Sequence, residues 1–333
     1  MAEIVLGIGA SHSPQVSSPP EVWSMHAERD RMNPDVRFEE RIKEVAASIQ
    51  DQLKPEVWQQ KYEQCQVSVE ELRRAIQEAH PDILVVVGDD QEELFWDDSK
   101  PTFGLFWGDE LKDLPHPLEE LHPSLRPVIW AWHTTDEVEA HPTHSELGSH
   151  IIECMMTEGF DVAQSKAQLD GRSLGHAYTF VKRRLAPSRD IPMVPVFVNC
   201  FYKPNQPTPA RCYEFGRALR RAIESWGEDK RVVVIASGGL SHFNLDEGLD
   251  QLVIQRIKER NPELLKTLPR ERLQGASGEI LNWITAIGAI EHLDLQYLDY
   301  VNGYRSPAGT GVGMTFAIWK YKCSLHQREG AIQ

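Results

Sequence analysis

Four apolar segments of this sequence are followed by side chains that can bind a metal ion or transfer a proton. The segments are residues 3–9, 83–88, 193–199 and 231–237. His12 comes shortly after the first segment, and His242 comes shortly after the fourth. The second segment is followed directly by Asp89, Asp90 and Gln91. Ligands of open α/β sheets bind beside the carboxyl ends of strands, so this pattern predicts a site there.

Each of these residues also has an ordinary structural role open to it. A histidine after a strand can hydrogen-bond a turn, and Asp89 can cap the next helix. Glu279 stands where a helix is expected to begin, and a carboxylate there interacts favourably with the helix dipole. Their joint occurrence is what indicates chemistry. Two neutral nitrogen or oxygen donors and one carboxylate, with open positions, suit non-haem Fe(II) working on O₂.

The elements that must position these residues can be predicted from the apolar pattern. The four segments are continuous apolar runs, which is typical of strands in a sheet covered on both faces. Between and after them, apolar residues recur at helical spacing in residues 67–80, 211–226, 252–268 and 279–290. We therefore expect an α/β fold with a central, mainly parallel or mixed sheet flanked by helices. We expect one domain over residues 1–333, with a helical insertion at about 17–66 and a loop-rich insertion at about 109–146.

The composition argues against several classes of protein. A net charge of −15 disfavours a nucleic-acid-binding surface and binding to an anionic membrane. No apolar run reaches the roughly 18 residues of a membrane span, and the N-terminus lacks the basic stretch of a signal peptide. We therefore expect a cytoplasmic protein. The 5 cysteines are scattered and form no CxxC, which argues against a disulfide framework or a zinc knuckle.

Six motifs follow one another along the chain. They are ASHSP, PDILVVVGDDQ, LGHAYTFVKRRL with IPMVPVFVN, ASGGLSHF, GEILNW and YRSPAGTGVGMTFAIW. In this order they resemble the class III extradiol ring-cleavage dioxygenases, the relatives of the protocatechuate 4,5-dioxygenase β subunit. The nearest in character are longer single-chain members that act on methoxylated or carboxylated catechols, gallates including 3-O-methylgallate, and lignin-derived hydroxylated biphenyls.

The resemblance implies Fe(II), O₂ and a substrate with two neighbouring hydroxyls on an aromatic ring. It also implies roles for individual residues. His12 matches the first iron-ligand histidine, Glu279 matches the carboxylate ligand, and His242 matches the catalytic base. His176 matches a further active-site histidine, in a segment where relatives usually read DHG and this chain reads GHA.

The second iron ligand is where this chain departs from the pattern. Relatives end the second strand in NDH or PDH, whereas Gln91 occupies the place of that histidine here. Either Gln91 or Asp90 serves as an oxygen ligand, or another histidine reaches in from an insertion, or the site has lost iron. The candidate histidines are His26, His144 and His150.

The sequence therefore predicts an Fe(II)-dependent extradiol dioxygenase of aromatic and lignin-derived compound catabolism, with Gln91 as the third metal ligand. We expect it to act as a homo-oligomer, a dimer, without a partner subunit. Two alternatives stay open. One is an inactive subunit or binding protein with the dioxygenase fold, because a fold does not guarantee chemistry. The other is a divalent-metal hydrolase in which the metal activates water.

Overall fold

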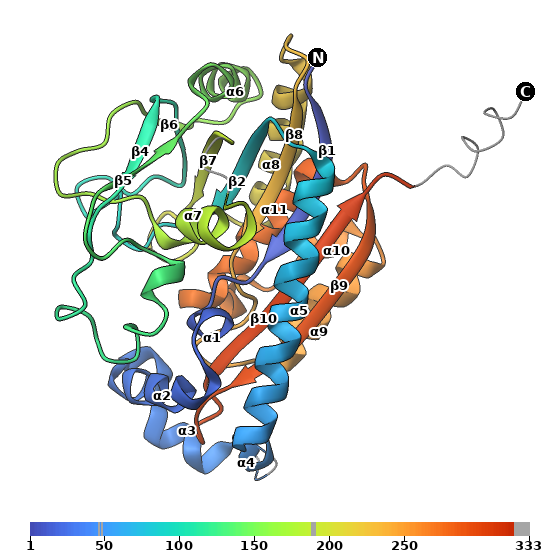
Figure 1. The fold of residues 1–333 in the computed structure, drawn as a ribbon. Coiled ribbons are helices and arrows are strands. Elements are labelled where there is room, and N and C mark those ends of the chain that lie inside the picture. The colour runs from blue at the N-terminus through green and yellow to red at the C-terminus, as the bar shows by residue number, and fades with distance from the viewer. Residues whose placement is uncertain (46, 48, 188–190, 323–333) are drawn as a thin grey trace, which may run out of the picture.

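The computed structural model describes residues 1–322 apart from 46, 48 and 188–190 (Figure 1). Its centre is a mixed sheet of eight strands in the order β6-β3-β7-β2-β8-β1-β10-β9. The inner strands β7, β2, β8 and β1 are parallel, and β10 and β9 continue the sheet antiparallel. The predicted α/β fold is confirmed. The strands are β1 (Glu3–Ala10), β2 (Ile83–Gly88), β3 (Phe103–Phe106), β6 (Ala163–Ser165), β7 (Met193–Val198), β8 (Arg231–Ser237), β9 (Asp294–Tyr304) and β10 (Gly311–Lys320).

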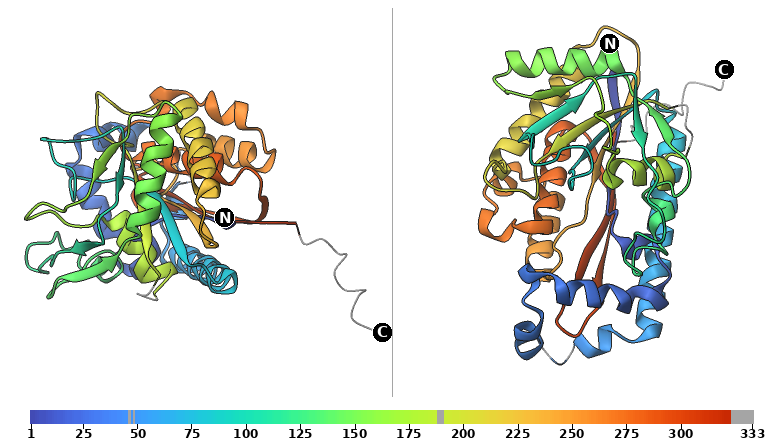
Figure 2. Two further views of the ribbon diagram at one scale, coloured as in Figure 1. Left: turned by 90° about the horizontal axis from the view of Figure 1, so that it is seen from above. Right: turned by 90° about the vertical axis from the view of Figure 1, so that its left-hand side faces the viewer.

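Helices cover both faces of this sheet, which explains why its inner strands are apolar without alternation (Figures 1 and 2). In β2, Ile83, Val85 and Val87 pack into the same core as α8 and α11. Leu84 and Val86 pack into the opposite core, with α5 and α7. The helices are α1 (Pro14–Ser17), α2 (Trp23–Met32), α3 (Phe38–Glu44), α4 (Ile49–Gln52), α5 (Pro55–Ala79), α6 (Ser145–Thr157), α7 (His176–Phe180), α8 (Pro209–Ser225), α9 (Glu247–Lys258), α10 (Pro262–Lys266) and α11 (Ile280–Ile290).

Two helices differ from the expected boundaries. The helix expected from residue 67 begins earlier, at Pro55, because the first half of α5 packs against the end of the β9–β10 hairpin. There Trp58 Nε1 donates a hydrogen bond of 2.9 Å to the Tyr304 carbonyl. The helix expected over 252–268 is two helices, since Pro262 cannot continue α9 and instead starts α10.

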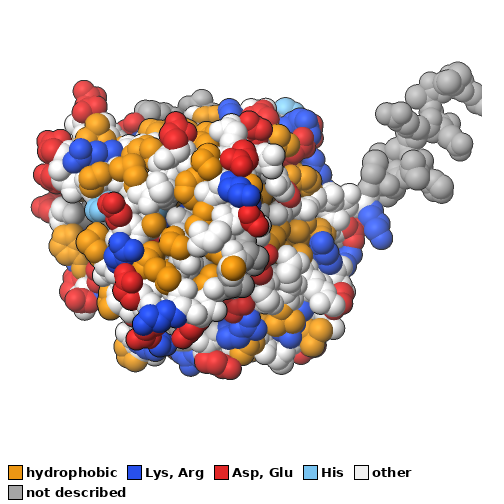
Figure 3. Space-filling view, turned by 90° about the horizontal axis from the view of Figure 1, so that it is seen from below, with side chains coloured by type: hydrophobic (Ala, Val, Ile, Leu, Met, Phe, Trp, Pro, Cys, Tyr) orange, Lys and Arg blue, Asp and Glu red, His pale blue; other side chains and the backbone are white. Residues whose placement is uncertain are grey.

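Of the two predicted insertions, the helical one begins just after the carboxyl end of β1, whereas the loop-rich one reaches the start of β7, where Thr143 pairs with Met193. The short helices α1 to α4 belong largely to the helical segment, and the loop-rich segment contains the two-stranded sheet of β4 (Glu110–Asp113) and β5 (Glu139–Pro142). On the face seen in Figure 3, the described Lys and Arg side chains are interspersed with Asp and Glu and form no basic stripe. Cys65, Cys154, Cys200 and Cys212 are free, and Cys323 lies outside the described residues. Within the described part of the chain, none of the helices combines the length and apolar character that a membrane crossing requires.

The close contact between β1 and α11 gives a first prediction. A Cβ atom at Gly9 would overlap the ring of Trp283, a fully buried side chain whose Nε1 donates to the Gly238 carbonyl at 2.8 Å. We expect Gly9→Ala to lower the free energy of unfolding by about 1–3 kcal/mol, measured by chemical denaturation. Gly227→Ala is the matched control, because a Cβ there meets no atom within 4 Å, and it should change stability by less than about 0.5 kcal/mol. Equal stability of both variants would contradict this packing.

Candidate metal centre and active site

The structure brings together side chains from three neighbouring strand ends and one helix start. β1, β2 and β8 are adjacent and parallel, so their carboxyl ends lie at the same edge of the sheet. His12 follows β1, Asp89 follows β2, and His242 follows β8. Glu279 directly precedes α11, which packs beside β8. His12, Glu279 and His242, which the sequence placed in one site, are in fact neighbours.

A short chain of hydrogen bonds fixes the orientation of His12. The Ser237 hydroxyl donates to the Ala177 carbonyl at 2.6 Å, and His12 Nδ1 lies 3.0 Å from the same hydroxyl oxygen. Because the hydroxyl has given its only proton to Ala177, it accepts from the Nδ1–H of His12. Nε2 of neutral His12 therefore carries a lone pair. It faces Glu279 Oε2 at 3.6 Å, so two acceptors point at each other.

Glu279 is buried and receives donors on both oxygens. Oε2 accepts the backbone N–H of Gly239 at 2.7 Å, and Oε1 lies 3.1 Å from His242 Nε2. Burial opposes ionisation of this carboxyl, but the charge of His242 outweighs it and holds the pKa of Glu279 well below the usual range. Glu279 is therefore an anion at neutral pH, which a metal ligand must be.

Asp89 is the third member of this group; the sequence analysis included it among the polar strand-end residues, with a helix cap as the alternative, and did not name it as a metal ligand. It is fully buried and accepts hydrogen bonds from Asn282 Nδ2 and Gln91 Nε2, each at 3.2 Å. One ligand atom each of His12, Asp89 and Glu279 lies within 4.8 Å of the other two. Burial, followed by the like charge of Glu279, raises the pKa of Asp89. Two buried carboxylates facing an imidazole lone pair fit a divalent cation.

The structure bears on the alternatives for the ligand at the end of β2. Asp90 caps the following turn, accepting the backbone N–H groups of Leu94 and Phe95 at 2.8 and 3.0 Å. Gln91 lines the pocket described below, and its amide nitrogen is directed to Asp89. Gln91 as a metal ligand stays a prediction, and Asp89 is a stronger competitor because its carboxylate belongs to the close group.

The three insertion histidines lie elsewhere. His144 caps α6 by accepting the N–H of Leu147 at 3.3 Å, and His150 Nε2 lies 2.9 Å from the Ser225 hydroxyl. α6 lies beside α8, at the opposite end of the molecule from α2 and α3 (Figure 1). His26 is buried in α2, and neither of its ring nitrogens has a hydrogen-bond partner among the described residues. None of the three belongs to a group of potential ligands in the described chain.

His242 is held so that only one of its nitrogens can exchange a proton at the centre. Its Nδ1 lies 2.8 Å from the Leu240 carbonyl, which can only accept, so Nδ1 keeps its proton. Nε2 is left to face Glu279. Burial lowers the pKa of His242, but the Glu279 carboxylate outweighs this and raises it. The geometry suits a residue that takes up and returns a proton at Nε2.

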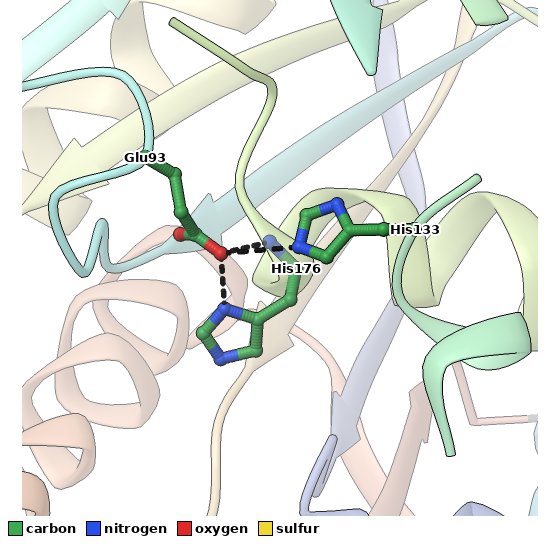
Figure 4. A group of neighbouring side chains, drawn as sticks. All are labelled: Glu93, His133 and His176. Carbon is green, nitrogen blue, oxygen red and sulfur yellow. Dashed lines mark hydrogen bonds and ion pairs between the residues drawn. The ribbon is translucent and has the colours of Figure 1, made fainter. Parts of the chain in front are cut away.

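His176 begins α7, and its ring meets the ring of His12 edge-on, with 4.7 Å between centroids. Its Nδ1 lies 2.6 Å from Glu93 Oε1, and His133 Nε2 approaches the same oxygen at 3.4 Å (Figure 4). Burial lowers the pKa of His176, but the Glu93 carboxylate outweighs this and raises it to about 9. The sequence analysis missed Glu93 and His133. Glu93 lies two residues after the GDDQ motif, which was the available signal, whereas His133 lies in the loop-rich segment without any motif.

A pocket of about 490 Å³ opens above these residues. His12, Gln91, His176, His242 and Glu279 line its inner end. Its outer wall comes from the two segments predicted as insertions, through Arg29 of α2 and through His122 and Trp132. This volume suits a small-molecule ligand, and both segments predicted as insertions contribute residues to the wall of the pocket.

Known proteins share sequence similarity with this chain. Residues 45–313 match the family described as the catalytic LigB subunit of aromatic ring-opening dioxygenase, and the chain belongs to this family. It is 34% identical over 164 residues to a gallate dioxygenase of Pseudomonas putida, an alignment covering 44% of this chain and 46% of that protein. It is 24% identical over 236 residues to a 2,3-dihydroxyphenylpropionate/2,3-dihydroxicinnamic acid 1,2-dioxygenase of Comamonas testosteroni, covering 68% and 65%. The chain thus matches less than two-thirds of the length of either relative. The predicted resemblance to the class III extradiol dioxygenases is confirmed.

The orientation of His12 by Ser237 can be tested directly. Ser237→Ala removes the acceptor that holds Nδ1–H, so we expect divalent-metal affinity to fall about 10- to 100-fold. Anaerobic Fe(II) titration measures the affinity. Thr285→Val is the matched control, because it also removes one buried hydroxyl, which donates only to the Leu281 carbonyl within α11. Unchanged affinity in Ser237→Ala would show that this hydrogen bond does not orient a ligand.

Proposed function

We propose that this member of the LigB family is an Fe(II)-dependent extradiol dioxygenase that opens the ring of a carboxylated catechol with O₂. The observation that carries the proposal is the group of His12, Asp89 and Glu279 beneath a pocket that His242 also lines. We also propose that the protein acts in aromatic and lignin-derived compound catabolism, forms a homodimer and is located in the cytoplasm.

In this proposal His12, Asp89 and Glu279 hold the metal ion. Bound Fe(II) would transfer electrons between a diol and O₂. The side chains of the site cannot do this themselves, because they have no redox chemistry. The protein contributes the donor set, its orientation and an enclosed pocket. Ser237 and the backbone N–H of Gly239 fix the two ligands that face each other, His12 and Glu279.

His242 and His176 act on the substrate diol. Since the Leu240 carbonyl retains the Nδ1 proton of His242, Nε2 is the nitrogen at which His242 exchanges a proton with a diol hydroxyl. Nδ1 of His176 is engaged by Glu93, so its Nε2 is the nitrogen available to a substrate oxygen. A protonated His176 stabilises a diol that has lost its proton.

The charge on the pocket wall supports a carboxylated substrate. Two arginines line the pocket, and Arg305 is neutralised by Asp30 through hydrogen bonds of 2.8 and 2.7 Å. The Arg29 guanidinium makes no hydrogen bond or ion pair with any residue that the structure describes. Burial and the charge of Arg305 lower the pKa of Arg29, so it lies where an anion is favoured. Gallate and dihydroxyphenylpropionate, in the names of the two relatives, are carboxylates.

Oxygen uptake tests the proposed function. Protein reloaded anaerobically with Fe(II) should consume one O₂ per diol with protocatechuate, gallate or 3-O-methylgallate, and a new absorbing product should form. His242→Ala should keep its iron but lose about 10²- to 10⁴-fold in kcat. No uptake with these diols or with a hydroxylated biphenyl, in protein that retains iron, would refute the proposal. Metal-dependent hydrolysis without O₂ would favour the hydrolase.

The role of Arg29 gives a separate prediction. Arg29→Met removes a charged hydrogen-bond donor worth about 1.5–3 kcal/mol, so KM for protocatechuate should rise about 10- to 100-fold. KM for catechol, which has no carboxylate, should stay unchanged. Arg31→Met is the control on the same helix, because Arg31 is exposed and paired with Glu39. An equal loss with both substrates would show that Arg29 does not recognise the carboxylate.

A further inference from the structure

Glu93 connects the pocket to a buried set of charged groups that have no role in the proposed reaction as described above. Its Oε1 accepts both the backbone N–H of His176, at 2.9 Å, and the Nδ1–H of the same residue, at 2.6 Å. One carboxylate oxygen therefore fixes the first residue of α7 by its main chain and by its ring. In Figure 4 the carboxylate points between the imidazoles of His176 and His133.

Glu93 is itself held from behind. His133 Nε2 lies 3.4 Å from Glu93 Oε1, and His133 Nδ1 lies 2.7 Å from Asp113 Oδ1. The other oxygen of Asp113 accepts the N–H of Thr134 at 2.8 Å and a bond from Arg183 Nη2 at 3.1 Å. Asp113, His133, Glu93 and His176 thus form an alternating row of carboxylates and imidazoles that ends in the pocket.

Unlike an ordinary buried ion pair, this row of side chains ends at a pocket. His176 Nε2 has no hydrogen-bond partner in the described part of the chain, and the residue lines the pocket beside His12. The Trp132 ring lies 5.0 Å away, and its Nε1 donates to the His12 carbonyl at 3.0 Å. Among the described residues, every side-chain polar atom of the row has a hydrogen-bond or ion-pair partner except Nε2 of His176.

The chain leaves room for Glu93 at one specific position. A Cβ atom at residue 175 would lie 2.5 Å from Glu93 Oε2, and Gly175 avoids this contact. The carboxylate can therefore approach the start of α7 closely enough to bind two N–H groups of His176.

We propose that Glu93 is a positioning residue for substrate binding. By engaging Nδ1 and the main chain of His176, it directs Nε2 at the diol, and His133 with Asp113 keeps Glu93 in place. This inference rests on the proposed function for the identity of the diol. It concerns how tightly the diol is bound and oriented, so it can be measured without turnover. Misplacing a substrate-binding group by a small distance is enough to weaken binding and rate strongly.

Glu93→Gln and His176→Asn, singly and together, form the test. The readouts are the dissociation constant of protocatechuate, by anaerobic calorimetry on the Fe(II) enzyme, and kcat and KM. Glu93→Gln keeps the shape of the side chain but loses its charge and one acceptor. We expect at least a tenfold weaker binding of protocatechuate in each single variant. Because Glu93 acts through His176, the double variant should be no weaker than His176→Asn.

Glu92→Gln is the matched control. Glu92 is the preceding residue, is half-exposed and pairs with Lys100, so this variant should bind protocatechuate like the unaltered enzyme. Gly175→Ala displaces the carboxylate without removing it and should weaken binding in the same direction. Iron content should stay unchanged in every variant.

Two results would overturn the proposal. One is unaltered binding in Glu93→Gln. The other is a further loss on adding Glu93→Gln to His176→Asn, since Glu93 would then act independently. Failure of the proposed function would give a different result, because the unaltered enzyme would bind protocatechuate but consume no O₂. The dissociation constants of the single and double variants would still decide the role of Glu93.

Discussion

The structure of this site depends on one constraint, the direction of the lone pair on His12 Nε2. The Ala177 carbonyl takes the Ser237 proton, so Ser237 takes the Nδ1 proton of His12, and Nε2 is left facing Glu279 and Asp89. Ser237 ends β8, His12 follows β1, and Ala177 lies in α7, so the constraint exists only because β1 and β8 are paired and α7 packs on them. The order of strands in the sheet thereby determines that Nε2 is the atom of His12 available to bind a metal ion.

Two neighbouring clusters in the pocket contain the same residue types but differ in chemistry. In the group of His12, Asp89 and Glu279, an imidazole lone pair faces carboxylates, and a cation is needed to hold the group together. In the group of Glu93, His133 and His176, the one carboxylate instead accepts hydrogen bonds from the main-chain and ring N–H groups of His176. In each cluster, the hydrogen bond made by one ring nitrogen of a histidine decides whether its other nitrogen carries a proton or a lone pair. This decides which of the two chemistries the cluster suits. The first cluster suits a metal, and the second suits the positioning of a substrate-binding group.

The sequence predicts the central part of this arrangement and misses its periphery for physical reasons. The apolar runs identify β1, β2, β7 and β8 because both faces are buried, and the site edge follows from their parallel order. His12 and His242 could be placed together on that basis, and Glu279 was placed with them by the family resemblance. A capping role was one alternative for Asp89, but Asp90 is the residue that caps the following turn. The sequence pattern does not show which of two adjacent carboxylates points inward. Glu93, His133 and Arg29 depend on how loops and short helices fold over the edge, which no periodic pattern encodes.

Iron retention in two single variants tests the central claim most directly. Asp89→Asn and Gln91→Met would be loaded with Fe(II) anaerobically, desalted and analysed for iron per chain. If His12, Asp89 and Glu279 hold the metal, Asp89→Asn loses iron and Gln91→Met retains it like the unaltered protein. The opposite result, iron kept without the Asp89 carboxylate and lost without the Gln91 amide, would contradict the account and return the third ligand to Gln91.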